Sequence, residues 1–275
     1  MNELASVPGP VLLVGAGKMG GALLEGWLAR GLPPALVAVR DPAPAPFVVK
    51  LIATRRIARD PDPPLIPIHA AVVLAVKPQD AATVVPQIAR FVGPDTVVVS
   101  IMAGRTLASL AKFLPKYAPI VRAMPNTPAA IGRGITVAVP NNRVKEAERR
   151  LADLLLSATG PVEWIKNEKW MDAVTAVSGS GPAYVFLLAE ALARAGVAAG
   201  LPKPLAERLA RETVAGSGEL LHRSEHAAGK LRENVTSRGG TTEAALKHLM
   251  GRSGLEALMK KAVAAATKRS RQLAG

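Results

Sequence analysis

A glycine-rich segment close to the N-terminus has the residue spacing of a loop that binds phosphate. It reads Gly15, Ala16, Gly17, Lys18, Met19 and Gly20. In a Gly-x-Gly-x-x-Gly loop the first glycine permits a tight turn, the second lets a pyrophosphate approach the backbone, and the third allows close packing of the following helix. Free N–H groups at the start of that helix then face the phosphate charge. We predict that these residues bind the pyrophosphate of a dinucleotide.

The residues that end the next predicted strand bear on which dinucleotide is bound. Arg40 and Asp41 lie side by side there. An acidic residue at this place binds the ribose hydroxyls of NAD, whereas a basic residue suits the 2′-phosphate of NADP. We predict NADP, with Arg40 as its binding residue, and keep NAD as the alternative because of Asp41.

Two other segments follow predicted strands and belong to the same candidate site. The first consists of Ala75, Val76, Lys77 and Pro78. In the second, Asn126 stands between Pro125 and Pro128 in a stiff loop. Because α/β sheets bind ligands beyond the carboxyl ends of their strands, we predict that both segments lie near the ribose and nicotinamide. The alternatives are a surface lysine before a turn and an ordinary connecting turn.

A polar, glycine-containing segment in the second half of the chain is the candidate substrate site. Its predicted binding residues are Ser237, Gly239, Gly240, Thr241 and Thr242. The glycines leave the backbone bare before a predicted helix, Thr242–Met250, and unpaired N–H groups at a helix start suit a carboxylate. The alternative is a plain helix cap approached through glycine.

The elements that must position these segments alternate between strands and helices in the first half. Predicted strands cover Val11–Val14, Leu36–Val39, Val72–Val76, Val97–Ile101, Ile120–Ala123 and Thr136–Val139. A helix is predicted over Gly21–Arg30, and in the proline-rich stretch Asp41–Pro67 only near Val48–Arg59. The alternation predicts an α/β fold: a Rossmann-type domain with a parallel sheet, covering residues 1–163.

The second half carries helical patterns only and is predicted to be a separate domain, residues 164–275. Its predicted helices are Ala183–Ala199, Pro204–Arg223, Thr242–Met250 and Leu255–Leu273. Helices this rich in alanine and leucine need more apolar surface to pack against than their own half offers. We therefore predict that this domain dimerises.

Composition excludes several classes of function. The chain of 275 residues has no cysteine, and its four histidines show no metal-binding pattern, so we predict neither a thiol nor a metal centre. The first residues do not resemble a signal peptide, and we count no uncharged apolar run long enough to span a bilayer. The net charge of +14 is interpreted as a solvated basic surface, with nucleic-acid binding as the alternative. We expect a cytoplasmic protein that binds neither nucleic acid nor membrane.

The motifs taken together resemble those of pyrroline-5-carboxylate reductase, the last enzyme of proline biosynthesis. The resemblance rests on Gly15–Gly20, Ala75–Gln79, Ser100–Gly104, Met124–Pro128, Ser178–Tyr184 and Ser237–Thr242, in this order. It extends from Val11 to about Leu258, nearly the whole chain. Any one motif could arise by chance, but the full series in register is highly specific.

The resemblance implies both an architecture and a reaction. It implies a Rossmann-type domain followed by a helical domain that interlocks with a partner's to form a homodimer, often assembled further. It implies hydride transfer from NADPH or NADH to the C=N carbon of 1-pyrroline-5-carboxylate, giving L-proline. Thr242, beside Thr241, would offer a hydroxyl to the ring nitrogen as the catalytic group. Such a reaction depends mainly on positioning, so the lack of a histidine or cysteine centre fits it.

This sequence departs from the family pattern at Arg238, where the family has proline in Ser-Pro-Gly-Gly-Thr-Thr. Arginine makes that loop less rigid and adds a positive charge. This change bears on the reaction rate and on the affinity for the substrate, and not on the fold. A rival interpretation is a β-hydroxyacid or related imine dehydrogenase that uses Lys166 or Lys169 as its acid. A rival of another class is a protein that binds NADP or nucleic acid without catalysis. The Ser-x-Gly-Gly-Thr-Thr segment argues against the first, and intact motifs in both halves argue against the second.

Overall fold

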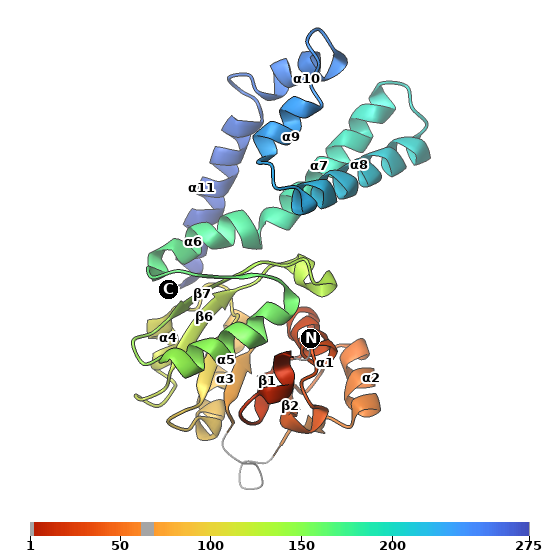
Figure 1. The fold of residues 1–275 in the computed structure, drawn as a ribbon. Coiled ribbons are helices and arrows are strands. Elements are labelled where there is room, and N and C mark those ends of the chain that lie inside the picture. The colour runs from red at the N-terminus through yellow and green to blue at the C-terminus, as the bar shows by residue number, and fades with distance from the viewer. Residues whose placement is uncertain (1–2, 62–68, 275) are drawn as a thin grey trace. The chain divides into compact units, whose positions relative to one another are not determined.

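The computed structural model describes residues 3–61 and 69–274 of the chain (Figure 1). They form two compact units, one of Met1–Gly179 with Thr267–Gly275 and one of Ser180–Ala266. The predicted division between residues 163 and 164 falls within strand β8 (Val162–Trp164), whereas the compact units divide between Gly179 and Ser180.

The first unit is built on an eight-stranded sheet in the order β3-β2-β1-β4-β5-β6-β7-β8. Besides β8, its strands are β1 (Val11–Val14), β2 (Val37–Arg40), β3 (Ala58–Arg59), β4 (Ala71–Leu74), β5 (Val97–Ser100), β6 (Ile120–Met124) and β7 (Thr136–Pro140). All neighbouring strands are parallel except β6 and β7. The prediction of a parallel sheet is therefore wrong for that pair. A short 3₁₀ helix, Thr127–Ile131, joins them in place of the crossover helix that a parallel pair requires.

Helices cover both faces of this sheet, so its central strands are buried on both sides. Helices α1 (Lys18–Ala29), α2 (Pro46–Arg55) and α5 (Glu146–Leu156) pack on one face, while α3 (Ala81–Ile88) and α4 (Leu107–Ala111) pack on the other. Successive residues of β1 consequently join different cores: Leu13 packs under α1, and Leu12 packs under α3. Two-sided burial is why these strands read as continuous apolar runs rather than as alternating patterns.

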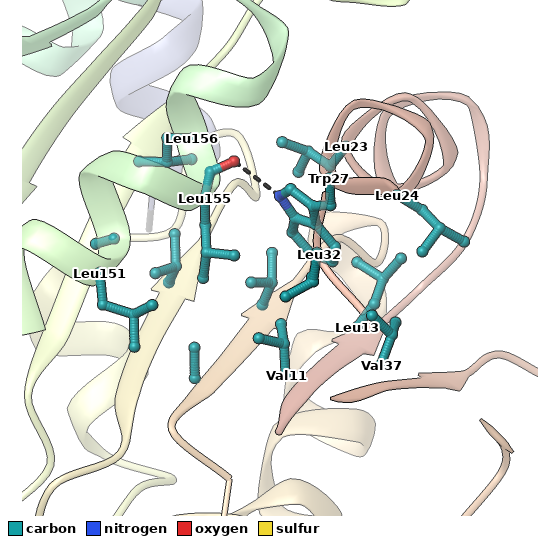
Figure 2. Packing of buried hydrophobic residues seen from close by; sticks show 14 of the residues in the cluster. Val11, Leu13, Leu23, Leu24, Trp27, Leu32, Val37, Leu151, Leu155 and Leu156 are labelled. Atoms are coloured by element: carbon teal, nitrogen blue, oxygen red, sulfur yellow. Dashed lines mark hydrogen bonds between the residues drawn. The ribbon is translucent and has the colours of Figure 1, made fainter. Parts of the chain in front are cut away.

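Trp27 joins α1 to α5 at the centre of one core (Figure 2). The indole is fully buried, and its Nε1 atom donates a 2.8 Å hydrogen bond to the carbonyl oxygen of Leu155. A buried tryptophan needs such a partner because an unpaired N–H in an apolar core is costly. The bond fixes α1, and with it the glycine-rich loop at the start of this helix.

The proline-rich connection after β2 contains more structure than its composition suggests. Helix α2 starts at Pro46, where proline is tolerated because the first N–H groups of a helix need no partner within it. The region predicted to be helical, Val48–Arg59, thus contains most of α2, and its last two residues form β3. Residues 62–67 of this stretch lie outside the described residues.

His69 is buried just before β4 without a hydrogen bond to its ring. The residue is 1% exposed, and neither ring nitrogen has a partner among the described residues. Its ring packs edge-on against Phe91, with 5.7 Å between ring centres. Burial lowers the pKa of His69 below its usual value of 6.5. The folded protein therefore holds this imidazole in its neutral form at neutral pH.

We expect His69 to make the folded state less stable in mild acid. Because the pKa is lower in the folded than in the unfolded chain, the unfolded chain takes up the proton first as the pH falls. The free energy of unfolding should then decline from about pH 6.5 down to the folded-state pKa. Urea unfolding of wild type and His69→Phe between about pH 7.5 and 5.5 should show a smaller decline for the variant. Parallel pH profiles would contradict this assignment.

The second unit is helical. It contains α7 (Gly181–Ala198), α8 (Lys203–Arg223), α9 (Ala228–Asn234), α10 (Thr241–Leu249) and most of α11 (Leu255–Ala274). Helices α7 and α8 pack together where Gly196 meets Ala206, and a side chain at Gly196 would come within 3.2 Å of the Ala206 Cβ. The predicted helices are present with small shifts at their ends, whereas α9 was not predicted. The short helix α6 (Met171–Val174) and a π-helical turn, Thr175–Gly179, lead into α7.

Large apolar side chains lie exposed on α7 of this unit. Phe186 is 62% exposed, Leu187 56% and Leu188 50%. The helical stretch Glu168–Ala198 has a mean hydropathy of 1.3 over its most apolar window, long and apolar enough by composition to cross a membrane. In the sequence this stretch does not form one continuous apolar run, because Thr175, Ser178 and Ser180 interrupt it. Exposed apolar surface of this extent marks an interaction site of the helical unit.

Candidate active site

The glycine-rich loop between β1 and α1 is held tightly against neighbouring backbone. Gly15 has a φ of +90°, and its N–H donates to the carbonyl of Arg40 at 2.9 Å. A side chain at Gly15 would lie 2.7 Å from backbone atoms of Ala75, and one at Gly20 would overlap the Gly15 carbonyl. These two glycines are therefore required by the protein's own packing.

Gly17 differs from Gly15 and Gly20 because neither the packing of the protein nor the backbone conformation requires a glycine at this position. A Cβ atom there would meet no protein atom within 4 Å, and its φ of −74° is open to any residue. Gly17 is also the N-cap of α1, and no side chain caps the N–H groups of the first turn. Open space beside uncapped N–H groups fits the pyrophosphate of a dinucleotide.

Asp41 fixes the glycine-rich loop through both of its carboxylate oxygens. Oδ2 accepts a hydrogen bond from the N–H of Ala16 at 2.5 Å, and Oδ1 accepts one from Ala43 at 2.8 Å. The N–H of Ala16 is thus engaged within the protein. Sequence reasoning considered Asp41 only as a partner of ribose, and its role as a loop anchor was missed.

Arg40 borders the same loop and makes no ion pair with a described residue. Its guanidinium lies 5.9 Å from the ring centre of Phe91, whose other close cation is Arg90 at 5.4 Å. A half-buried guanidinium without a carboxylate partner retains its donors for an anion.

A cleft of about 760 Å³ lies beyond the carboxyl ends of β1, β2 and β4. It is lined by Val14, Gly15, Gly17, Arg40, Asp41, Pro42, Ala43, Asp60, Ala75, Val76, Lys77, Asp80, Thr83, Val84 and Gln87. The position of β1 between β2 and β4 makes this the point where the strand order reverses, the usual ligand site of such sheets. The cleft unites the glycine-rich loop, Arg40 and the Ala75–Lys77 segment. Thr83, Val84 and Gln87 of α3 were not predicted.

Several other predicted cofactor residues do not line the cleft. Lys18, Met19 and Gly20 form the first turn of α1, and Pro78 starts the 3₁₀ helix Pro78–Asp80. Asn126 follows β6, where its Oδ1 atom accepts a 3.0 Å hydrogen bond from the N–H of Ile135. This bond stabilises the connection between β6 and β7.

The predicted substrate segment lies in the helical unit at the start of α10. Gly239 has a φ of +74°, and its N–H donates to Oε2 of Glu243 at 2.7 Å. Gly240 is the N-cap of α10, which begins at Thr241, and no side chain caps this end. Ser237 and Thr241 are exposed and Thr242 is partly exposed. The N-terminus of α10 is therefore open to an anion, and Glu243, which sequence reasoning did not single out, shapes its approach.

Among the described residues no cluster of three or more histidine, aspartate or glutamate side chains could hold a metal ion. The titratable groups of the cleft likewise include no histidine.

Two family models match different parts of the chain. Residues 10–104 match the model "NADP oxidoreductase coenzyme F420-dependent". Residues 168–273 match the model "Pyrroline-5-carboxylate reductase dimerisation". The first match covers the glycine-rich loop and all the residues that line the cleft, and the second covers the exposed apolar helix α7 and the Ser237–Thr242 segment.

Whole-chain comparisons agree with these matches. Pyrroline-5-carboxylate reductase from Pseudomonas aeruginosa is 39% identical over 96% of both chains, and that from Arabidopsis thaliana is 36% identical over 94% of both. The solved pyrroline-5-carboxylate reductase of Coxiella burnetii has a TM-score of 0.89 at 33% identity, covering 97% of this chain and 99% of its own. The Plasmodium falciparum enzyme, solved with NADP bound, has a TM-score of 0.81 at 28% identity, covering 98% and 99%. Similarity of this extent along both units makes the chain a member of the pyrroline-5-carboxylate reductase family.

Proposed function

We propose that this chain reduces 1-pyrroline-5-carboxylate to L-proline with hydride from NADPH. Full-length similarity to curated reductases carries the proposal, and the open, uncapped loop at Gly17 beside a cleft supports the cofactor. NADPH supplies a hydride to the imine carbon, and one proton on the ring nitrogen completes the amine. Hydride transfer to a protonated imine requires positioning and charge more than a strong base.

The residues of this chain divide into a cofactor set and a substrate set. The first turn of α1 binds the pyrophosphate, and Arg40 binds the 2′-phosphate. Ala75–Pro78 and Asn126 lie toward the ribose and nicotinamide. At the start of α10, the uncapped N–H groups of the first turn and the hydroxyls of Ser237 and Thr241 bind the substrate carboxylate, and the Thr242 hydroxyl bonds to the ring nitrogen. The N–H groups of Gly239 and Gly240 are already bonded to Glu243 and to the Ser237 carbonyl, so these two glycines contribute by leaving the backbone bare before the helix.

NADPH is proposed over NADH because of the different states of Arg40 and Asp41. Both oxygens of Asp41 already accept backbone N–H groups, which leaves this carboxylate poorly placed to bind ribose hydroxyls. Arg40 has no ion-pair partner among the described residues, and a 2′-phosphate would supply one.

The protein is proposed to work in the cytoplasm as a homodimer or a larger assembly of dimers, without nucleic acid or membrane. The exposed apolar side chains of α7 lie within the match to the dimerisation model, which supports burial against a second copy rather than in lipid. The rival dehydrogenase is disfavoured because the curated relatives that match the chain over almost its whole length are pyrroline-5-carboxylate reductases.

A coupled assay tests the proposal directly. Purified protein is mixed with 1-pyrroline-5-carboxylate, cofactor oxidation is followed by absorbance, and proline is quantified. Substrate-dependent oxidation that yields proline, faster with NADPH than with NADH, is expected. No oxidation of either cofactor would refute the reductase, and faster turnover with NADH would refute the assignment of Arg40.

Replacing Thr242 by Val should lower kcat/KM for the imine about tenfold, the effect of losing one hydrogen bond to a charged group. The cofactor dissociation constant should stay unchanged, since the cofactor cleft belongs to the other unit. Thr241→Val is the matched control, because the neighbouring hydroxyl is proposed to contact only the carboxylate and should mainly raise KM. Equal effects of the two substitutions on kcat would contradict the role given to Thr242.

A further inference from the structure

We propose that Arg105 is a positioning residue that clamps the Ala75–Pro78 segment for cofactor binding. Its Nε and Nη2 atoms both donate to the carbonyl oxygen of Pro78, at 2.8 and 2.6 Å. Arg105 follows β5 and Pro78 follows β4, so the side chain joins two neighbouring strand ends. The inference rests on the proposed function only in taking the cofactor to be a dinucleotide.

The two bonds are not needed for the local structure of the Pro78 turn. The same carbonyl already accepts the N–H of Ala81, which closes the 3₁₀ helix Pro78–Asp80. Arg105 therefore adds a cross-link between segments rather than satisfying an orphaned carbonyl. Because two nitrogen atoms of one half-buried guanidinium donate to the same oxygen, the orientation of the Arg105 side chain is fixed. A lysine, with a single nitrogen atom, cannot fix its orientation in this way.

The clamped segment forms one wall of the cleft and supports the glycine-rich loop. Val76 and Lys77 line the cleft, and the N–H of Ala75 donates to the Val14 carbonyl at 2.7 Å. Ala75 also lies so close to Gly15 that a side chain at position 15 would not fit. A shift of this segment would consequently move the phosphate loop and the ribose side of the cleft together.

The segment that follows Arg105 is itself held in place, so the Arg105 side chain extends from a fixed part of the backbone. The N–H of Leu107 donates to Oε1 of Glu168 at 2.8 Å, and the same oxygen accepts Nη1 of Arg122 at 2.8 Å. The Arg122 side chain is 5% exposed and that of Glu168 28% exposed. A mostly buried ion pair of this kind holds its groups in one arrangement, because separating them would leave an uncompensated charge.

Two substitutions and a control test the clamp. Arg105→Met keeps the aliphatic part of the side chain and removes both hydrogen bonds to Pro78. Arg105→Lys keeps the positive charge but can donate from one nitrogen atom only. Arg150→Met is the control for loss of a positive charge, since Arg150 is 76% exposed on α5 and, among the residues that the structure describes, forms an ion pair only with Glu146 in its own helix. The readouts are amide hydrogen exchange of residues 75–80 in the cofactor-free protein, the NADPH dissociation constant from fluorescence, and KM and kcat.

For Arg105→Met we expect faster exchange at residues 75–80 and an NADPH dissociation constant raised about tenfold, with little change in KM for the imine. Arg105→Lys should fall between wild type and Arg105→Met, and Arg150→Met should match wild type. Unchanged exchange, unchanged NADPH affinity, or an equal effect of Arg150→Met would overturn the proposal. Failure of the proposed function would give a different result, because the wild-type protein would then bind NADPH without reducing the imine. Amide hydrogen exchange and NADPH affinity would still measure the effect of Arg105 in that case.

Discussion

Gly17→Ala will leave the free energy of unfolding nearly unchanged and weaken NADPH binding about 100-fold. The folded protein offers no obstacle to the new methyl group, because no protein atom lies within 4 Å of the Cβ position and the backbone there is extended with φ of −74°. The methyl group would instead occupy the space in which a pyrophosphate meets the start of α1. Losing two charge-assisted hydrogen bonds at about 1.5 kcal/mol each accounts for the expected factor.

Gly26→Ala on the same helix is the matched control. A Cβ atom there would lie 2.7 Å from the Ala158 carbonyl oxygen, so this substitution should lower the stability by disturbing the packing of α1. Its effect on NADPH affinity should be small as long as the protein stays folded. Urea unfolding and NADPH fluorescence of both variants separate the two effects. Unchanged NADPH affinity in Gly17→Ala would show that the loop is not the pyrophosphate site.

Local signals predicted the elements that bear the site. Strand β1 and the glycine-rich loop follow from neighbouring residues, because an apolar run buried on both faces and a glycine at positive φ each leave a direct mark in the sequence. The start of α10 was predicted within one residue for the same reason. These are the features that short-range physics controls.

The missed features depend on contacts between residues far apart in the chain. Asp41 and Ala16 are separated by 25 positions, and Arg105 and Pro78 by 27. No periodicity or turn signal records such a pairing, so Asp41 was considered only as the alternative partner of a ribose, and Arg105 was not singled out. The direction of β7 was also missed, because strand composition does not distinguish parallel from antiparallel pairing.

The apolar face of α7 links the fold of the helical unit to its assembly. Buried large side chains are scarce in this unit, where Ala206 and Ala210 are the buried residues of α8 and α7 has none. A helical unit that leaves phenylalanine and leucine exposed needs a second surface to complete its core. The match of residues 168–273 to a dimerisation model supports the proposal that this second surface belongs to another copy of the chain.

Phe186→Glu should therefore raise the dimer dissociation constant at least about 1,000-fold and abolish reductase activity. Losing the burial of a phenylalanine costs about 2 kcal/mol, and placing an unpaired carboxylate in an apolar interface costs several kcal/mol more. Sedimentation should show a monomer, while NADPH should still bind because the cofactor cleft belongs to the first unit. The activity should fall with the dimer, because the proposed substrate residues at the start of α10 belong to the same helical unit as the apolar face of α7.

Val49→Glu is the control for adding a carboxylate at an exposed apolar position. Val49 is 45% exposed on α2, outside the residues that match the dimerisation model, and its replacement should leave both assembly and activity at wild-type levels. Circular dichroism verifies that helix content survives in both variants. A Phe186→Glu protein that remains dimeric would show that this face of α7 does not form the interface. A monomer with full activity would show instead that the substrate site of one chain is complete without its partner.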